Sequence, residues 1–190
     1  MESLKKFFDQ QTPVPPEAWE LIKSKFTELN FKHGECIIRE GQKTPFQLFI
    51  AQGITRTFYF KDGKEITVDF SFENSFTTCY ASWFTGEPSR SFMSAIEQVN
   101  CYKISKESLH ELYDQHKLGE RLGRIIAEKK FLKKELREAT LLLDSPRERF
   151  IWLHENHKDW IQRVPQQYLA SYIGISPETY SRYKSTAINQ

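Results

Sequence analysis

The residues best suited to chemistry stand near the end of the chain, in the segment VPQQYLASYIGISPETYSRYKSTA from Val164 to Ala187. An apolar stripe with helical spacing leads up to Gly174, which supplies the positive φ that a sharp turn requires. Ser176 and Pro177 then suit the N-cap and the first position of a second helix. Two short helices joined in this way predict a helix-turn-helix, whose second helix enters the major groove of DNA.

The second helix of this motif carries side chains that can bond base edges and phosphates. Arg182 is predicted to read a guanine, because its guanidinium fork matches O6 and N7, and Glu178 can accept from a cytosine amine. Neighbouring polar side chains suit phosphate contacts, which position the protein without reading sequence. The predicted DNA-binding set is Gln166, Gln167, Ser176, Glu178, Thr179, Ser181, Arg182, Tyr183 and Lys184. A short helical hairpin without function is the alternative interpretation of this segment.

A long helix is predicted upstream of the motif, over residues 118–143. Its apolar residues alternate at spacings of three and four, a heptad seam with one polar break at Lys129. The alternatives are an amphipathic helix packed on its own domain and a homodimeric coiled coil, and the length of the repeat favours the dimer. The predicted interface residues are Leu118, Leu122, Ile125, Leu132, Leu136 and Leu143.

Short strands are predicted between Phe31 and about Ile104. The pair Asp62-Gly63 separates TRTFYF from EITVDF, two runs rich in β-branched and aromatic residues, which is a strong hairpin signal. Glycines recur between further short runs, as in a β-sandwich or roll. Before the strands, a helix is expected to place Trp19 to Leu29 on one face, and after the long helix Ile161 to Val164 read as extended chain.

Composition excludes several classes of protein. The 190 residues include 27 Lys and Arg against 25 Asp and Glu, a net charge of +2, so the chain is neither polybasic nor an acidic tail protein. Residues 1–110 hold 13 basic and 14 acidic side chains, whereas residues 111–190 hold 14 and 11. No apolar stretch is long enough to span a membrane, and MESLKKFFDQ is too short and polar for a signal peptide. We expect a cytoplasmic protein.

Catalytic and metal chemistry are not indicated. The three cysteines are dispersed, which favours neither a disulfide framework nor a zinc or iron–sulfur site. The iron site of a cupin-type enzyme would need a His-x-His pair at strand spacing, and the sequence has none. His154 and His157 have helical spacing but no evident third ligand. We therefore expect no enzyme activity, no cofactor and no metal.

The order of these elements resembles the Crp/Fnr family of bacterial transcription regulators. HGECIIREGQKTPFQLFIAQGITRTFYFKDGKEITVDF is similar to the family's cyclic-nucleotide-binding-type roll, SPRERFIWL to the start of its DNA-binding domain and ISPETYSR to its recognition helix. The resemblance implies an α+β fold with an N-terminal β-roll, a double-stranded β-helix. It further implies a sensor domain over residues 1–116, a dimerisation helix over 117–143 and a helix-turn-helix domain over 144–190.

The resemblance is incomplete where the family binds its effector. Arg90 and Ser91 match the end of the phosphate cassette and are the predicted ligand-binding pair, with a plain surface arginine as the alternative. The family's Gly-Glu is missing, and Tyr80 stands where its carboxylate belongs. Cyclic AMP is therefore not expected. An aromatic cluster around Tyr80 could line an apolar pocket or form core.

The resemblance implies a homodimeric, sequence-specific transcription regulator that binds double-stranded DNA. Pro177 replaces an arginine with which many members contact bases, so the target site is expected to differ from theirs. RNA polymerase and an unknown small-molecule effector are further candidate partners, and no membrane partner is expected. The alternative function is a ligand-binding or scaffold module of the same fold that does not bind DNA.

Overall fold

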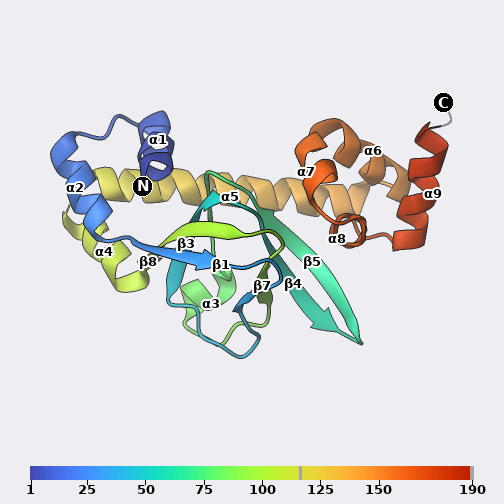
Figure 1. Ribbon diagram of the computed structural model, residues 1–190, viewed down its shortest axis with the longest axis horizontal. Helices are drawn as coiled ribbons and strands as arrows, with labels where there is room; N and C mark the ends of the chain where they lie inside the picture. The colour runs from blue at the N-terminus through green and yellow to red at the C-terminus, as the bar shows by residue number, and fades with distance from the viewer. Residues whose placement is uncertain (116, 189–190) are drawn as a thin grey trace. The chain divides into compact units, whose positions relative to one another are not determined.

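The computed structural model describes residues 1–115 and 117–188 and divides into two compact units (Figure 1). Unit 1 comprises Met1–Tyr59 and Asp69–Lys129, and unit 2 comprises Phe60–Val68 and Lys130–Gln190. The division passes through the long helix and assigns the tip of one hairpin to the C-terminal unit. The ends of two predicted domains, residue 116 and residues 189–190, lie outside the described residues.

Unit 1 contains a roll of two four-stranded sheets, apart from the hairpin tip at residues 60–68, with strand orders β1-β8-β3-β6 and β2-β7-β4-β5. Partners are far apart in sequence: β1 pairs with β8, Thr27 opposite Lys103 and Phe31 opposite Val99. The strands are β1 Thr27–Phe31, β2 Cys36–Ile38, β3 Phe46–Gln52, β4 Thr55–Lys61, β5 Lys64–Ser71, β6 Ser75–Thr77, β7 Phe92–Ala95 and β8 Val99–Ser105. The predicted roll is confirmed.

The hairpin between β4 and β5 turns at the predicted pair. Asp62 and Gly63 both have positive φ, 51° and 74°, as a two-residue type I′ turn requires. The turn after β3 depends on Gly53, because a Cβ there would overlap the main chain of Gln98. Glu73 secures this second turn by accepting a 2.8 Å hydrogen bond from the Gly53 N–H.

The main core of unit 1 lies where helices pack against the roll. Phe49 and Phe76 meet edge to face with ring centroids 5.2 Å apart, and Trp19 and Leu122 belong to the same buried cluster. The surrounding helices are α1 Glu2–Gln11, α2 Pro16–Ser24, α3 Tyr80–Thr85 and α4 Lys106–Gln115. The expected helix through Leu29 was wrong: α2 ends at Ser24, because residues 27–31 pair with β8 instead.

The long helix α5, Lys117–Leu143, confirms the predicted span. Its first turns pack closely on α4. A Cβ at Gly119 would lie 2.6 Å from the carbonyl oxygen of Leu112, and one at Gly123 would overlap the Tyr113 ring. Glycine at these two positions therefore lets α4 and α5 approach each other.

Unit 2 is helical apart from the hairpin tip. Ser145 and Glu148 form a capping box at the start of α6: the Ser145 N–H donates to the Glu148 carboxylate at 2.7 Å, and the Glu148 N–H donates to Ser145 Oγ at 3.3 Å. The helices are α6 Pro146–Asn156, α7 Lys158–Arg163, α8 Gln166–Tyr172 and α9 Pro177–Ile188. Among the described residues, none of the helices is both long and apolar enough to cross a membrane.

Ile161 to Val164 were predicted to be extended. This was wrong for Ile161 to Arg163, which continue α7 from Lys158, whereas Val164 at the C-cap has extended backbone. The helix places Trp160 and Val164 one turn apart, and both side chains are buried. Burial of this pair outweighs the local preference of a short β-branched segment for extended chain.

Candidate nucleic-acid interface

The helix-turn-helix is formed by α8 and α9 with a tight turn between them. Gly174 has φ of 68°, and the Ile175 N–H donates to the Ala170 carbonyl at 3.0 Å. Ser176 Oγ accepts from the Thr179 N–H at 3.2 Å and so caps α9, and Pro177 occupies its first position. The predicted turn, cap and second helix are confirmed.

The inner face of α9 is fixed by a buried aromatic cluster. Tyr180 is 1% exposed, and its ring meets Phe150 edge to face with centroids 5.1 Å apart. Its hydroxyl lies 3.0 Å from His154 Nε2. Burial raises the pKa of Tyr180 to about 12. Burial, followed by the nearby Lys184 charge, lowers the pKa of His154. The cluster holds α9 on α6 in an uncharged interior.

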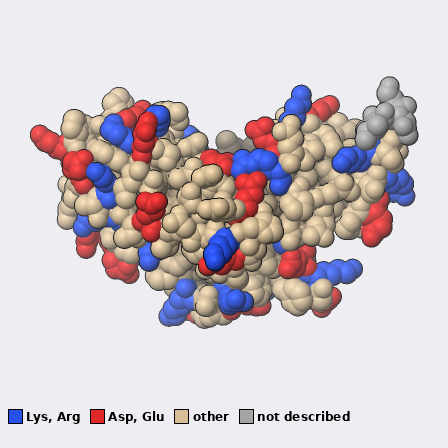
Figure 2. Space-filling model, viewed as in Figure 1, with Lys and Arg blue, Asp and Glu red and all other residues tan. Residues whose placement is uncertain are grey.

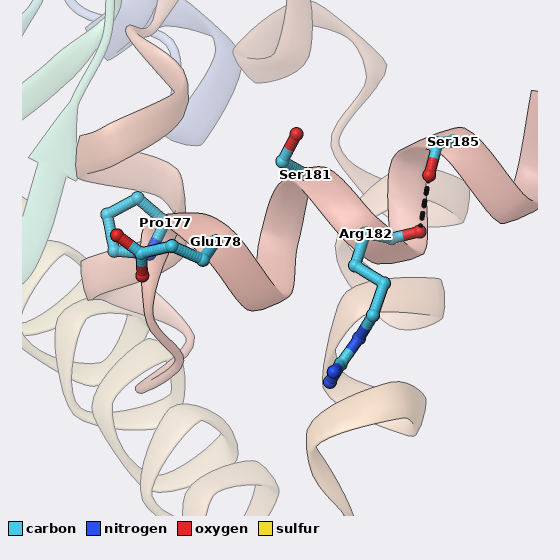
Figure 3. Close-up of a pocket in the computed structure, with 5 residues that line it drawn as sticks. All are labelled: Pro177, Glu178, Ser181, Arg182 and Ser185. Carbon is cyan, nitrogen blue, oxygen red and sulfur yellow. Dashed lines mark hydrogen bonds between the residues drawn. The ribbon is translucent and has the colours of Figure 1, made fainter.

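The outer face of α9 is open. Pro177, Glu178, Ser181, Arg182 and Ser185 line a shallow hollow of about 510 Å³ along it (Figure 3). The Arg182 side chain extends away from the helix (Figure 3), and its guanidinium carbon lies 5.6 Å from the Tyr183 ring centroid. Ser185 Oγ bonds back to the Arg182 carbonyl at 2.9 Å. A single helix therefore presents a cation, an anion and two hydroxyls on one accessible surface.

The outer face of α9 carries both an anionic and a cationic side chain, so it can both accept and donate hydrogen bonds. The pKa of Glu178 is lowered, chiefly by a hydrogen bond from Ser176 and to a smaller extent by the charge of Lys64. Glu178 is therefore ionised at neutral pH and can only accept hydrogen bonds. Figure 2 shows acidic and basic side chains interspersed over the face of the molecule in view, in keeping with a net charge of only +2.

The predicted DNA-binding residues fall into two groups. The half-buried residues are Gln166, Thr179 and Tyr183. The exposed residues are Gln167, Ser176, Glu178, Ser181, Arg182 and Lys184. The hollow brings together Glu178, Ser181 and Arg182 from this set and adds Pro177 and Ser185. Ser185 lies seven residues after Glu178, two turns along the same helix face.

The structure separates the two residues predicted to bind a ligand in the roll. Arg90 is exposed, whereas Ser91 is 7% exposed. The Ser91 hydroxyl donates to Cys79 Sγ at 3.3 Å and so faces the interior. Tyr80 has a buried hydroxyl, and burial followed by the Asp69 charge raises its pKa. Arg90 and Ser91 therefore do not face the same accessible site.

Three of the aromatic residues near this region belong to the core. Phe70, Phe76 and Trp83 are at most 4% exposed, whereas Phe84 is 68% exposed. The three cysteines are free thiols, and burial raises the pKa of Cys101 to about 12. Within the described part of the chain, no three His, Cys, Asp or Glu side chains are placed to hold a metal ion.

The predicted dimer seam divides into two parts. Leu122 is 3% exposed and lies in the core of unit 1, and the half-buried Leu118 packs against the same cluster. Ile125 is half-buried. Farther along α5, the exposed apolar residues are Phe131 (70%), Leu132 (54%), Leu136 (57%), Leu142 (76%) and Leu143 (82%). The seam that is accessible is therefore shorter than the predicted one and lies toward the C-terminal end of α5.

Comparisons with known proteins agree with this architecture. Residues 28–116 match the family model of the cyclic nucleotide-binding domain. The fold is similar to that of FixK2 from Bradyrhizobium japonicum, with 18% identity and a TM-score of 0.75 over 87% of this chain and 85% of that one. No curated protein matches the sequence.

Two further solved structures share the fold. CLP, the c-di-GMP-responsive global regulator of Xanthomonas campestris, is 15% identical, with a TM-score of 0.72 over 92% of each chain. The catabolite activator protein of Thermus thermophilus is 18% identical, with a TM-score of 0.54 over 94% of this chain and 85% of that one. At these identities the likeness concerns the fold.

Proposed function

We propose that the chain is a homodimeric, sequence-specific DNA-binding regulator of transcription of the Crp/Fnr type. Its fold is similar to those of FixK2 and CLP, and residues 28–116 match the cyclic nucleotide-binding domain. The observation that carries this proposal is the helix-turn-helix of α8 and α9, with the outer face of α9 open. An exposed helix face that carries Arg182 and Glu178 has the size and chemistry to read base edges in a major groove.

Each residue of the α9 face has a distinct role in this proposal. Arg182 donates two hydrogen bonds to O6 and N7 of a guanine, and the ionised Glu178 accepts one from a cytosine amine. Ser181 and Ser185 are short hydroxyl side chains that fit beside these two. Gln167 and Lys184 are exposed and bond phosphates, which sets the register of the protein on the duplex.

Dimerisation rests on the exposed apolar residues of α5. Leu132, Leu136 and Leu143 are spaced by four and seven residues, as on one seam of a heptad repeat, and Phe131 and Leu142 widen it. Five large apolar side chains exposed within 13 residues form the kind of patch that marks an interaction site. A second copy fits it best, because a two-fold axis presents the same patch on both partners.

The dimer explains how short helices read a long site. Two-fold pairing along α5 places the two recognition helices about one DNA turn apart, roughly 34 Å, to face successive major grooves of a near-palindrome. A ligand in the roll would act by shifting the population between two arrangements of the dimer. The surface position of Arg90 and the tyrosine at position 80 favour a ligand other than cyclic AMP.

Dimerisation is tested by light scattering on the purified chain. The wild type is expected to have the mass of two chains at micromolar concentration. Leu136→Lys places a charge in the middle of the seam and is expected to give monomers. Glu138→Lys adds a like charge about 200° around the same helix and is expected to remain dimeric. A monomeric wild type, or a dimeric Leu136→Lys variant, would contradict the seam.

DNA binding is tested by fluorescence anisotropy with labelled duplexes over a range of salt concentrations. Binding through several phosphates must weaken steeply with salt, since each contact releases counterions. A protein that binds no duplex even at low salt would instead be a ligand-binding or scaffold module of the same fold.

A further inference from the structure

The tip of the β4–β5 hairpin is hydrogen-bonded to the first helix of the helix-turn-helix through one serine. Ser171 Oγ accepts from the Thr67 N–H at 2.9 Å and donates to the Glu65 carbonyl at 3.0 Å. Glu65 and Thr67 are alternate residues of β5, which forms one edge of its sheet. The Ser171 hydroxyl therefore bonds one N–H and one C=O of an edge strand.

An arginine of the long helix completes this contact. Arg137 Nη2 donates to the Thr67 carbonyl at 3.2 Å and to the Tyr172 carbonyl at 3.0 Å, and its guanidinium carbon lies 4.7 Å from the Tyr172 ring centroid. Thr67, whose exposed fraction is 0%, is therefore held at its N–H by α8 and at its carbonyl by α5. All these residues belong to unit 2.

A second arginine holds the turn that follows. Arg149 Nε donates to the Ile173 carbonyl at 2.8 Å, and its Nη1 donates to the Asp144 carbonyl at 2.7 Å. The carbonyls of Tyr172 and Ile173 lie at the end of α8, where the last carbonyls of a helix have no N–H donors within the helix. Arg137 and Arg149 therefore bond the carbonyls of the two residues that precede the turn between α8 and α9.

The hairpin tip also approaches the start of the recognition helix. Lys64, the first residue of β5, is close enough for its charge to contribute to the lowered pKa of Glu178. The hydrogen bonds of the hairpin nevertheless go to Ser171 and, through Arg137, to Tyr172. The reading face of α9 stays exposed in this docked arrangement, since Glu178, Ser181 and Arg182 are all accessible.

We propose that Ser171 and Arg137 are positioning residues through which the β4–β5 hairpin of the sensor roll controls DNA reading. The docked hairpin holds α8, and α8 sets the orientation of α9. The strands of the hairpin run back into the roll, where β4 pairs with β7. A change in the roll that displaces β4 or β5 is thereby transmitted to the helix-turn-helix. This inference rests on the proposed DNA-binding function and adds to it the route of regulation.

The experiment compares four variants of the full chain with the wild type. Ser171→Ala removes both hydrogen bonds, whereas Ser171→Thr keeps a hydroxyl at the same place. Arg137→Gln removes the guanidinium, and Arg147→Gln makes the same change at an exposed position of α6. Each is measured for affinity toward a DNA site selected with the wild type, for the salt dependence of that affinity, and for amide hydrogen exchange without DNA.

Ser171→Ala and Arg137→Gln are expected to bind the selected site about tenfold more weakly, as suits the loss of two hydrogen bonds to main chain. Ser171→Thr and Arg147→Gln are expected to stay within about twofold of the wild type. The slope of affinity against salt is expected to remain that of the wild type, because no phosphate contact is removed. Amide exchange is expected to accelerate at Thr67 and around residues 172–174.

Unchanged or increased affinity of Ser171→Ala would overturn the proposal, as would Ser171→Thr binding as weakly as Ser171→Ala. If the wild type selects no DNA, the proposed function fails. Amide hydrogen exchange then still tests the contact between the β4–β5 hairpin and α8 without DNA. Unchanged exchange at Thr67 in Ser171→Ala would overturn this contact, and accelerated exchange would support it.

Discussion

Replacing Arg182 by alanine tests the reading role of α9 directly. The side chain is exposed and extends from the hollow on the outer face of the helix (Figure 3). Its carbonyl, which accepts from Ser185 and Thr186, is retained in the variant. The substitution should therefore change the free energy of unfolding by no more than about 0.5 kcal/mol, the usual range for surface positions.

The effect on DNA binding is expected to be much larger. A bidentate arginine–guanine pair contributes about 1–3 kcal/mol of discrimination. A homodimer loses this pair in both half-sites, which lie far enough apart for the two losses to add. The expected loss is therefore about 2–6 kcal/mol for the whole site, or roughly 30-fold to 10⁴-fold in affinity.

The assay is anisotropy titration of a selected duplex and of a scrambled duplex of the same length. Arg147→Ala is the matched control, because it removes the same charge from an exposed position of α6 in the same unit. Arg182→Ala should lose affinity for the selected duplex and lose about threefold or less for the scrambled one, since non-specific binding depends on charge alone. Equal losses on both duplexes would refute the base-reading role and leave Arg182 as a phosphate contact.

Two further predictions concern the stability of unit 2. Burial lowers the pKa values of His154 and His157, with Lys184 and Lys133 as nearby like charges. Below about pH 6.5, the ordinary pKa of a histidine, the unfolded chain therefore binds more protons than the folded chain. The urea midpoint should be constant above that pH and should fall as the pH decreases through it. A midpoint that rises on acidification would contradict this prediction. Ser145→Ala removes the hydrogen bond that the Ser145 hydroxyl accepts from the Glu148 N–H and should destabilise α6 by about 1 kcal/mol. The measurement is the urea midpoint, which should be lower at unchanged slope. An unchanged midpoint would argue against the capping box.

Local signals in the sequence were sufficient to predict several features in detail. Asp62 and Gly63 are residue types that tolerate positive φ, so the turn of the hairpin could be predicted to the residue. Gly174, Ser176 and Pro177 likewise fix the turn and the start of α9 by their own conformational preferences. In each case the physical cause lies within four residues of the feature that it determines.

Features that depend on distant partners could not be predicted in this way. Leu29 continues a helical spacing but lies in β1, whose partner strand is about 70 residues away. Leu122 has the spacing of a dimer seam but is buried in the core of its own unit. Spacing identifies an apolar face and does not reveal what covers it.

The contact of Ser171 with the hairpin belongs to the same class. Ser171 and Thr67 are separated by 104 residues, and a serine within a short helix gives no local sign of its partner. The outer face of α9 was predicted more completely, because the shared face of positions 178, 181 and 182 follows directly from helical geometry.

The most direct test of the central claim is selection of bound fragments from random double-stranded DNA by the wild-type chain. We expect enrichment of one near-palindromic site whose half-sites are centred about 10 base pairs apart, one helical turn. We also expect each half-site to contain a G·C pair whose replacement abolishes the preference for that site. The absence of any enriched sequence, or enrichment of a site without two-fold symmetry, would contradict the account.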